Sequence, residues 1–476
     1  MAEPLWTPGE IAAALDTAPS GAMTVPVNGV SIDSRTLKGG DLFFAIKGER
    51  MDGHRFVSAA FDNGAAAAVV DQGFDAGDSF HPLFRVPDTL EALNALARRS
   101  RARTGARVIA VTGSVGKTGT KEMLRTMLSA AGRTHASEKS YNNLWGVPLS
   151  LARMPQDTSF GVFEIGMNHA GEITPLTSLV RPHIAIVTWV APVHIEFFGS
   201  LAKIADAKAE IFDGFEQGGV AILPSGNEEF ERLAAHARAK KARIVSFGEN
   251  READARLLSY EPDEDGATVA ADILGVRVRF LIRAPGRHLA QNAVAALAAA
   301  KLAGASLGDA AEALAEFEVP EGRGRSAEFD APDGKVLIID ESYNANPASM
   351  RAALDVLGTR KRFARRIAVL GDMLELGHAG PQFHAELASA VDSSGIDLVF
   401  CAGSLMACLY EKLPKQKQGG WAEKSEALRA MLLAEVRGGD AVMIKGSLGS
   451  RMGQLASALK QRFSNPTAAD EGRGRA

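Results

Sequence analysis

The sequence has few of the residues that mark an extracellular protein. Only two of its 476 residues are cysteines, Cys401 and Cys408. So small a number is more typical of buried thiols in a reducing cytosol than of a disulfide framework. The first residues contain no basic region followed by an apolar one, so we expect no secretion signal. We therefore predict a cytoplasmic protein.

The sequence also has no large net charge and no apolar stretch long enough to suggest a membrane span. The formal net charge is −4 and the sequence pI is about 6.2, which gives no reason to expect binding to nucleic acid or to an anionic membrane. The alanine-rich stretch 290–303 is interrupted by Gln291, Asn292 and Lys301. These polar residues indicate a packed helix, so we predict no integral membrane segment. The histidines form neither a zinc-ligand spacing nor a Ser-His-Asp arrangement.

The most informative segment that is present is 108–118. An apolar, β-branched run at 108–111 leads into the turn 113–116, and Lys117 and Thr118 then open a helical pattern. Such a loop cradles phosphate with its backbone N–H groups, while the lysine reaches the terminal phosphates and the threonine hydroxyl binds Mg²⁺. The usual pattern requires a glycine at 111, where Val111 stands. The alternative interpretation is an ordinary strand-to-helix turn with a surface lysine.

The length of the chain predicts about three domains, because 476 residues are too many for one core. Apolar runs that alternate with helical patterns indicate parallel strands covered on both faces. They lie at 108–111, 161–165, 184–190, 220–223, 336–339, 367–370, 398–402 and 441–444. We predict an α/β protein with a small mixed α/β domain at 1–85, a central parallel-sheet P-loop ATPase domain at 86–316 and a Rossmann-like domain at 317–463. The tail 464–476 is expected to be disordered.

Polar residues at the carboxyl ends of these strands are candidates for a site in the cleft between the two larger sheets. Glu164 is placed to share Mg²⁺ with Thr118, or is a solvated or capping acid. His194 is a candidate ligand or a structural histidine. Lys208 has the spacing of an exposed helical lysine, and spacing alone assigns it no role.

Considered together and in order, a set of motifs resembles the Mur ligase family along nearly the whole chain. The motifs are 33–35, 40–43, 48–56, the shortened loop 112–118, 141–149, 164–168, 194–200, 207–212, 286–288 with Asn292, 340–347, 370–377 and 445–447. The shortened loop accounts for the missing glycine at 111. The chain departs from the family at 224–227, where Asn and Asp are usual, and at Glu341, where a second Asp is frequent. Side-chain contacts that relatives make at 224–227 are therefore not carried over to this chain.

The resemblance implies a fold, a reaction and a set of partners. It is strongest to the family members that join D-Ala-D-Ala to UDP-MurNAc-tripeptide in cytoplasmic peptidoglycan precursor synthesis. In that reaction ATP converts the terminal carboxylate of the tripeptide to an acyl phosphate, and the amine of D-Ala-D-Ala displaces phosphate. The resemblance assigns UDP-sugar binding to the N-terminal domain. We expect a monomer.

The resemblance also implies roles for individual residues, with Lys117, His194 and Lys208 as the catalytic set. Two Mg²⁺ ions are expected, one on Thr118 and Glu164 and the other on His194 and a carbamylated Lys208. Further positions match ATP-binding residues of the family: Gly113, Ser114, Val115, Gly116, Lys117, Thr118, Asn292, Arg323 and Asp340. Four others match residues that hold the UDP-sugar peptide: Ser34, Arg35, Asn142 and Asn143.

Two other functions remain open at this point. A folylpolyglutamate synthase-like ligase shares the ATP core, but is not expected to carry motif 33–35 or the pair Asn142 and Asn143. A non-catalytic ATP-binding scaffold predicts the loss of phosphate and metal residues, which are present here. The sequence leaves open whether the third peptide residue is meso-diaminopimelate or L-lysine, and which side chains select D-Ala-D-Ala.

Overall fold

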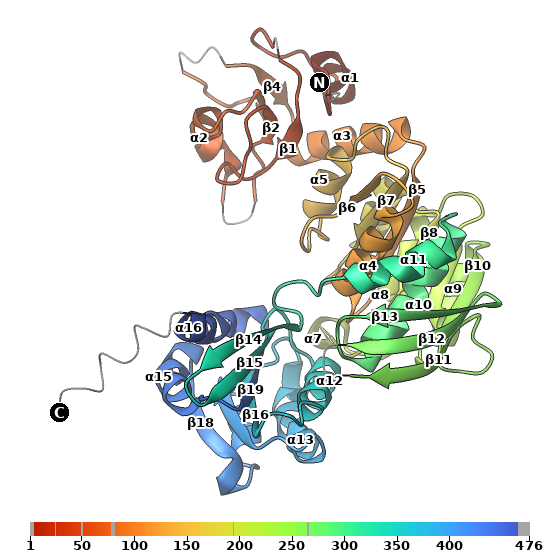
Figure 1. The fold of residues 1–476 in the computed structure, drawn as a ribbon. Helices are drawn as coiled ribbons and strands as arrows, with labels where there is room; N and C mark the ends of the chain where they lie inside the picture. The colour runs from red at the N-terminus through yellow and green to blue at the C-terminus, as the bar shows by residue number, and fades with distance from the viewer. Residues whose placement is uncertain are drawn as a thin grey trace.

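Three separate β-sheets organise the chain in the computed structural model (Figure 1). The structure describes residues 4–23, 25–48, 51–77, 81–193, 195–263 and 266–464. His194 therefore lies outside the described residues. So do residues 465–476 of the predicted tail, whereas Ser464 is the last residue of helix α16. Within the described ranges, no helix combines the length and apolar character needed to cross a bilayer.

The N-terminal sheet is entirely parallel, in the order β1-β2-β3-β4. Its strands are β1 (Gly29–Ser31), β2 (Asp41–Phe44), β3 (Ala67–Asp71) and β4 (Leu83–Val86). Helices α1 (Pro8–Leu15) and α3 (Thr89–Arg103) pack on one face, and α2 (Val57–Asp62) packs on the other. The sheet is joined to the next part of the chain by Trp6, which donates its indole N–H to the Ala152 carbonyl at 2.8 Å.

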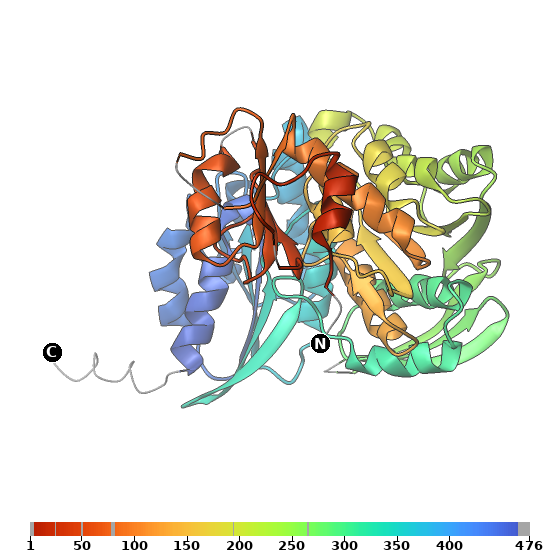
Figure 2. The same ribbon diagram turned by 90° about the horizontal axis from the view of Figure 1, so that it is seen from above.

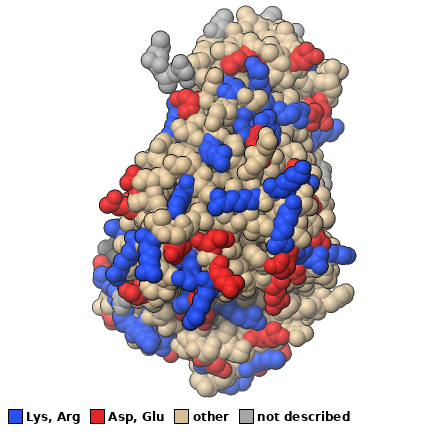
Figure 3. Space-filling view, turned by 90° about the vertical axis from the view of Figure 1, so that its right-hand side faces the viewer, with Lys and Arg blue, Asp and Glu red and all other residues tan. Residues whose placement is uncertain are grey.

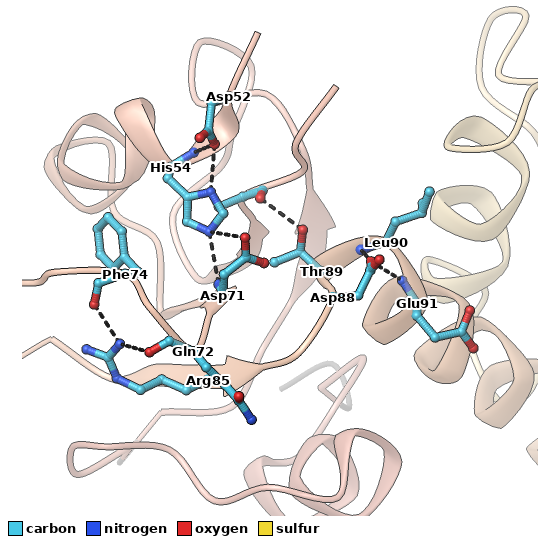
Figure 4. A network of polar contacts seen from close by, with 11 residues as sticks. Asp52, His54, Asp71, Gln72, Phe74, Arg85, Asp88, Thr89, Leu90 and Glu91 are labelled. Carbon is cyan, nitrogen blue, oxygen red and sulfur yellow. Dashed lines mark hydrogen bonds and ion pairs between the residues drawn. The ribbon is translucent and has the colours of Figure 1, made fainter. Parts of the chain in front are cut away.

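A histidine anchors the loop that precedes α2 in this sheet (Figure 4). The Nε2 atom of His54 accepts a hydrogen bond from the Asp71 N–H at 2.9 Å, and Nδ1 lies 2.6 Å from an Asp52 carboxylate oxygen. Because Nε2 is an acceptor, the proton of the neutral ring lies on Nδ1 and is donated to Asp52. The short helix η1 (Gly53–Phe56) is thereby fixed to the end of β3.

The central sheet has nine strands in the order β13-β12-β11-β10-β9-β8-β5-β7-β6. Its strands are β5 (Arg107–Thr112), β6 (Thr134–Ala136), β7 (Phe160–Glu164), β8 (Ile184–Val187), β9 (Val220–Pro224), β10 (Arg243–Gly248), β11 (Ala255–Pro262), β12 (Ala267–Ile273) and β13 (Val276–Ile282). The predicted central runs correspond to β5, β7, β8 and β9. The predicted parallel sheet is confirmed, and β12 and β13, which run antiparallel to their neighbours, extend it at one edge.

Helices cover both faces of the central sheet. One face carries α4 (Lys117–Ser129), α10 (Arg287–Leu302) and α11 (Leu307–Ala313), and the alanines of α10 at 293–300 are fully buried, as a packed helix requires. The other face carries α5 (Gly146–Ala152), α6 (Ile173–Val180), α8 (Leu201–Ala209) and α9 (Phe230–Ala239). The shorter elements are α7 (Ile195–Phe198), η2 (Glu210–Gly214) and η3 (Leu314–Glu316).

The C-terminal sheet has the order β14-β15-β19-β16-β17-β18 and is parallel except for β14. Its strands are β14 (Arg325–Ala331), β15 (Gly334–Glu341), β16 (Arg365–Gly371), β17 (Leu398–Ala402), β18 (Gln418–Ala422) and β19 (Asp440–Lys445). One face is covered by α12 (Pro347–Gly358), α13 (Gly380–Ser393) and α14 (Ala407–Tyr410), and the other by α15 (Ser425–Glu435) and α16 (Gly453–Ser464). Short helices η4 (Gly377–Ala379), η5 (Lys415–Lys417) and η6 (Leu448–Ser450) complete it. Cys401 and Cys408 are both free thiols.

The three sheets confirm the predicted three-domain α/β fold, while the boundaries at 85 and 316 stay predictions. Viewed from above, the N-terminal sheet projects over the side of the molecule that carries the C-terminal sheet (Figure 2). Lysine and arginine side chains are interspersed with aspartate and glutamate on the face shown in Figure 3.

Candidate functional site

The loop 113–116 between β5 and α4 is held in a conformation that only glycine tolerates at two positions. Gly113 and Gly116 have φ angles of +148° and +84°. A Cβ atom on Gly113 would lie 1.9 Å from the Thr188 hydroxyl oxygen, so the close packing of the loop also excludes a side chain there. Ser114 is buried, and its hydroxyl exchanges hydrogen bonds with the backbone of Ala191 at 2.9 and 3.0 Å.

Lys117 lies at the first turn of α4 and faces a cavity. Its Nζ donates to the Gly113 carbonyl at 2.7 Å, which folds the side chain back over the loop. Burial lowers the pKa of the Lys117 ammonium, the Glu164 carboxylate partly opposes this shift, and Arg323 adds to it. The lysine is therefore a positive charge held in an enclosed place, and not the solvated surface lysine of the alternative interpretation.

Two oxygen ligands suitable for Mg²⁺ come together beside this lysine. The Thr118 hydroxyl donates to Glu164 Oε2 at 2.8 Å, and Asn142 Nδ2 donates to Glu164 Oε1 at 2.7 Å. Glu164 ends β7 and is fully buried. The described residues include no group of three or more His, Cys, Asp or Glu side chains that could hold a metal. A two-ligand site suits Mg²⁺, which keeps waters and substrate phosphates as its other ligands.

Lys208 is buried near the end of α8, with a relative exposure of 4%. Burial lowers the pKa of its ammonium well below the ordinary value, and Lys117 lowers it further. No carboxylate among the described residues opposes this shift of the Lys208 pKa. The expectation of an exposed helical lysine from spacing is therefore wrong, and a buried amine without a counter-charge requires an explanation.

A cavity of about 470 Å³ separates the phosphate loop from the C-terminal sheet. Its central side includes Ser114–Lys117, Asn142, Glu164 and Asn292, and its C-terminal side includes Arg323, Glu341, Tyr343, Asn344, Asn346 and Lys445. The volume lies in the range of small-molecule sites. The predicted cleft between the two larger sheets is confirmed, and Arg323 reaches it.

Asp340 does not line this cavity. Its carboxylate accepts hydrogen bonds from the backbone N–H and hydroxyl of Ser342 at 3.2 and 2.6 Å, and pairs with Lys460 at 2.9 Å. Glu341 lines the cavity instead and pairs with Lys445 at 3.1 Å. The described geometry thus gives Asp340 a role in fixing the end of β15 to α16, and its predicted contact with ATP stays a prediction.

The residues predicted to hold the UDP-sugar peptide are not brought together around the cavity, Asn142 excepted. Arg35 is 86% exposed and pairs with Asp33 at 2.7 Å. The carbonyl of Ser34 accepts from Asn63 at 3.0 Å. Asn143 accepts from the N–H groups of Trp145 and Gly146, which shapes the turn into α5. Their predicted role in substrate binding stays a prediction.

Some cavity residues were assigned no role from the sequence. His288 lies in the first turn of α10 and Lys445 is the last residue of β19, and both belong to motifs that could have identified them. Tyr343 contacts Ser140, which is 203 positions away and carries no sequence signal. At the departure from the family pattern, Asn227 donates to the Val190 carbonyl at 2.9 Å and is a structural link between two loops.

Comparisons with known proteins extend this description. Three family models match the chain: the Mur ligase family catalytic domain over residues 26–101, the Mur ligase middle domain over 111–300, and the Mur ligase glutamate ligase domain over 324–448. Together they cover all three sheets.

Individual relatives match over nearly the full length. The UDP-N-acetylmuramoyl-tripeptide–D-alanyl-D-alanine ligase of Bacillus subtilis is 35% identical over 437 residues, which cover 91% of this chain and 93% of the relative. A crystal structure of MurF from Acinetobacter baumannii has a TM-score of 0.84 at 30% identity and covers 96% of this chain and 99% of its own. MurF from Thermotoga maritima, solved in complex with ADP, has a TM-score of 0.76 at 24% identity, covers 92% of this chain and 98% of its own, and shows the same fold.

Proposed function

Because the chain belongs to the Mur ligase family, we propose that it is an ATP-dependent ligase that joins D-Ala-D-Ala to UDP-MurNAc-tripeptide in peptidoglycan precursor synthesis. One observation carries the proposal on the structural side. The phosphate loop with Lys117 faces Arg323 across an enclosed cavity, beside the paired oxygens of Thr118 and Glu164. We place the reaction in the cytoplasm and expect a monomer.

The reaction has two steps. A carboxylate oxygen of the tripeptide attacks the γ-phosphorus of ATP, the bond to the β-phosphate oxygen breaks, and ADP leaves. The amine of D-Ala-D-Ala then attacks the acyl carbon, phosphate leaves with its bonding electron pair, and the amine loses a proton. The first step brings two anions together, so it needs positive charge at the transferred phosphoryl group more than covalent help.

The cavity supplies that charge from both sides. Lys117 and Arg323 line the cavity from opposite sides, and Arg323 lowers the pKa of the Lys117 ammonium. We assign the phosphates to residues 113–118 and the adenine side to Asn292, whose amide lies against Gly116. Enclosure excludes water and protects the acyl phosphate from hydrolysis.

The donor atoms fit Mg²⁺. Thr118 and Glu164 offer adjacent hard oxygens, and a bound Mg²⁺ there neutralises charge on the transferred phosphoryl group. We propose a second ion on His194 and Lys208. An amine adds CO₂ only when it is neutral, with the nitrogen bonding to carbon and a proton leaving to water. Burial of Lys208 favours the neutral amine, and the carbamate supplies the anion that this position otherwise lacks.

The UDP-substrate completes the assignment. We propose that it spans from Ser34 and Arg35 on the N-terminal sheet to Asn142 and Asn143 at the cavity, with residues 1–85 as the UDP-sugar-binding domain. Asn142 supports this path, because it lines the cavity and holds Glu164.

One assay tests the proposal. Phosphate release from ATP is measured with UDP-MurNAc-tripeptide and, in turn, D-Ala-D-Ala, D-Ala or meso-diaminopimelate as the amine. We expect release with D-Ala-D-Ala only. Running the assay with tripeptides ending in meso-diaminopimelate or L-lysine identifies the third residue. Release with folate and glutamate would favour a folylpolyglutamate synthase, and ATP binding without release would favour a scaffold.

A further inference from the structure

A contact between two hydroxyl groups connects the central part of the chain with the C-terminal sheet beside the cavity. The hydroxyl groups of Tyr343 and Ser140 lie 2.5 Å apart. Tyr343 follows β15, and Ser140 lies in the loop after β6. The guanidinium of Arg323 lies over the ring of Tyr343, 4.1 Å from its centre. The ring therefore touches both the opposite side of the cleft and the arginine that faces the phosphate loop.

On the C-terminal side, Tyr343 is held firmly. Its backbone N–H donates to the Gly322 carbonyl at 3.0 Å. Lys445, which is nearly fully buried, donates to Glu341 Oε2 at 3.1 Å and to the Asn344 carbonyl at 2.9 Å, and so fixes residues on both sides of the tyrosine. A ring fixed in this way restricts the directions open to a guanidinium stacked on it.

On the central side, Ser140 is held equally well. The fully buried Lys121 of α4 donates to the carbonyls of Ser137 and Lys139 at 2.7 and 2.9 Å. Two residues beyond Ser140, Asn142 donates to Glu164. The loop is thus tied both to the helix that starts with Lys117 and to the carboxylate that pairs with Thr118.

We propose that Tyr343 is a positioning residue for phosphoryl transfer, acting through its hydroxyl contact with Ser140 as a latch between the two sides of the cleft. With the latch made, Arg323 is presented to the cavity opposite Lys117. With the latch broken, the stacked arginine stays on its ring but moves with the C-terminal sheet. The inference rests on the proposed ligase function and assigns one step of its assembly to a specific pair of hydroxyl groups.

The test uses the full-length protein with Tyr343→Phe, Ser140→Ala and the double variant. Tyr343→Phe keeps the ring under Arg323 and removes only the hydroxyl. We expect each single variant to lower kcat about tenfold, with KM for the UDP-substrate within about twofold and an unchanged melting temperature. The double variant should be no slower than either single one. Ser140→Thr, which keeps a hydroxyl, should restore most of kcat, and Tyr410→Phe on α14 is the matched control.

A second measurement distinguishes a failure of the latch proposal from a failure of the proposed ligase function. With an ATP analogue and Mg²⁺ bound, small-angle scattering should give a larger radius of gyration for Tyr343→Phe than for the wild type. Equal radii, wild-type kcat in Tyr343→Phe, or effects of the two variants that multiply would each overturn the latch. A wild-type protein that fails to ligate D-Ala-D-Ala overturns the proposed function instead, and the scattering comparison still tests the latch.

Discussion

Lys117 is the residue on which the assignment of the phosphate site depends most directly. We expect Lys117→Ala to lower turnover by at least about a hundredfold, because removing one donor to developing charge in a closed site costs about 3–4 kcal/mol. Phosphate release measures the effect, and circular dichroism checks the fold. Lys203→Ala, at an exposed lysine of α8, is the control and should keep full activity. Activity within about tenfold of wild type would show that the loop is not the ATP site.

Lys208 offers a second prediction at the scale of one residue. Lys208→Ala should lose most activity because the metal ligand that we propose disappears, and a small carboxylate added to the assay should restore part of it. Lys208→Arg should stay inactive, since a guanidinium remains charged and cannot carry CO₂. Both are measured as phosphate release with and without the added carboxylate. Full activity in Lys208→Arg would rule out a carbamate.

The pair Asp340 and Glu341 shows where residue-level prediction from sequence ends. Both follow an apolar run, and both are acidic, so the pattern identified the end of the strand correctly. Consecutive residues of a strand point to opposite faces, and which one meets the cavity depends on the register. In the structure Glu341 pairs opposite Lys445 of β19 and lines the cavity, whereas Asp340 turns to Lys460.

At the scale of the element, substituting alanine for a glycine should have opposite effects in the phosphate loop and in the helix α4 that follows it. Gly113→Ala should abolish nucleotide binding and lower the melting temperature, because its Cβ would collide with Thr188. Gly119→Ala lies inside α4, where the nearest side-chain atom is 3.9 Å from the new Cβ, so it should stabilise the fold by about 0.5–1 kcal/mol. Thermal unfolding measures the melting temperature of each variant relative to the wild type. Equal melting temperatures would show that the loop is less tightly packed than described.

The elements that sequence patterns predicted best are those buried on both faces. β5 and β15 were identifiable because each contains a continuous apolar run, and α10 because its alanine-rich stretch is interrupted by polar residues. The hairpin of β12 and β13 was missed. β12 alternates between buried and half-buried residues, so it has no continuous apolar run, and the two-residue turn of the hairpin has positive φ at Leu274 and Gly275 without the usual Asn-Gly signal.

At the scale of the whole molecule, the contacts that join the three sheets could not be predicted from the sequence. Trp6 meets Ala152 across 146 positions, and Arg103, on α3, stacks 3.4 Å from the centre of the Trp6 ring. Local periodicity gives the number of sheets and their order along the chain. It does not specify which loops meet, because that depends on the packing of side chains distant in sequence.

The cavity between the central and C-terminal sheets predicts a change of shape on binding. Lys117 and Arg323 line the same cavity, and Arg323 lowers the pKa of the Lys117 ammonium, a repulsion that acts alongside the attraction of Lys117 to Glu164. The connection between the sheets contains Pro320 and two glycines, Gly322 and Gly324, with φ of +72° and +109°. In the absence of ligands we expect repulsion to favour an open arrangement about this connection. The phosphates of a bound ATP analogue should attract both Lys117 and Arg323. Binding of the analogue with Mg²⁺ and the UDP-substrate should therefore close the cleft and lower the radius of gyration.

Small-angle scattering with and without these ligands measures that change, and calorimetry confirms that they bind. Raising the salt concentration should reduce the difference in radius of gyration between the ligand-free and the ligand-bound protein. Salt screens the repulsion between Lys117 and Arg323 when the cleft is open to solvent. A matched variant sharpens the test. In Arg323→Gln the repulsion is absent, so the ligand-free protein should already approach the smaller radius, while its turnover falls because one cation of the phosphate site is lost. A radius that stays the same in wild type when binding is confirmed would mean that the cavity is preformed and that the cations tolerate each other in the free protein.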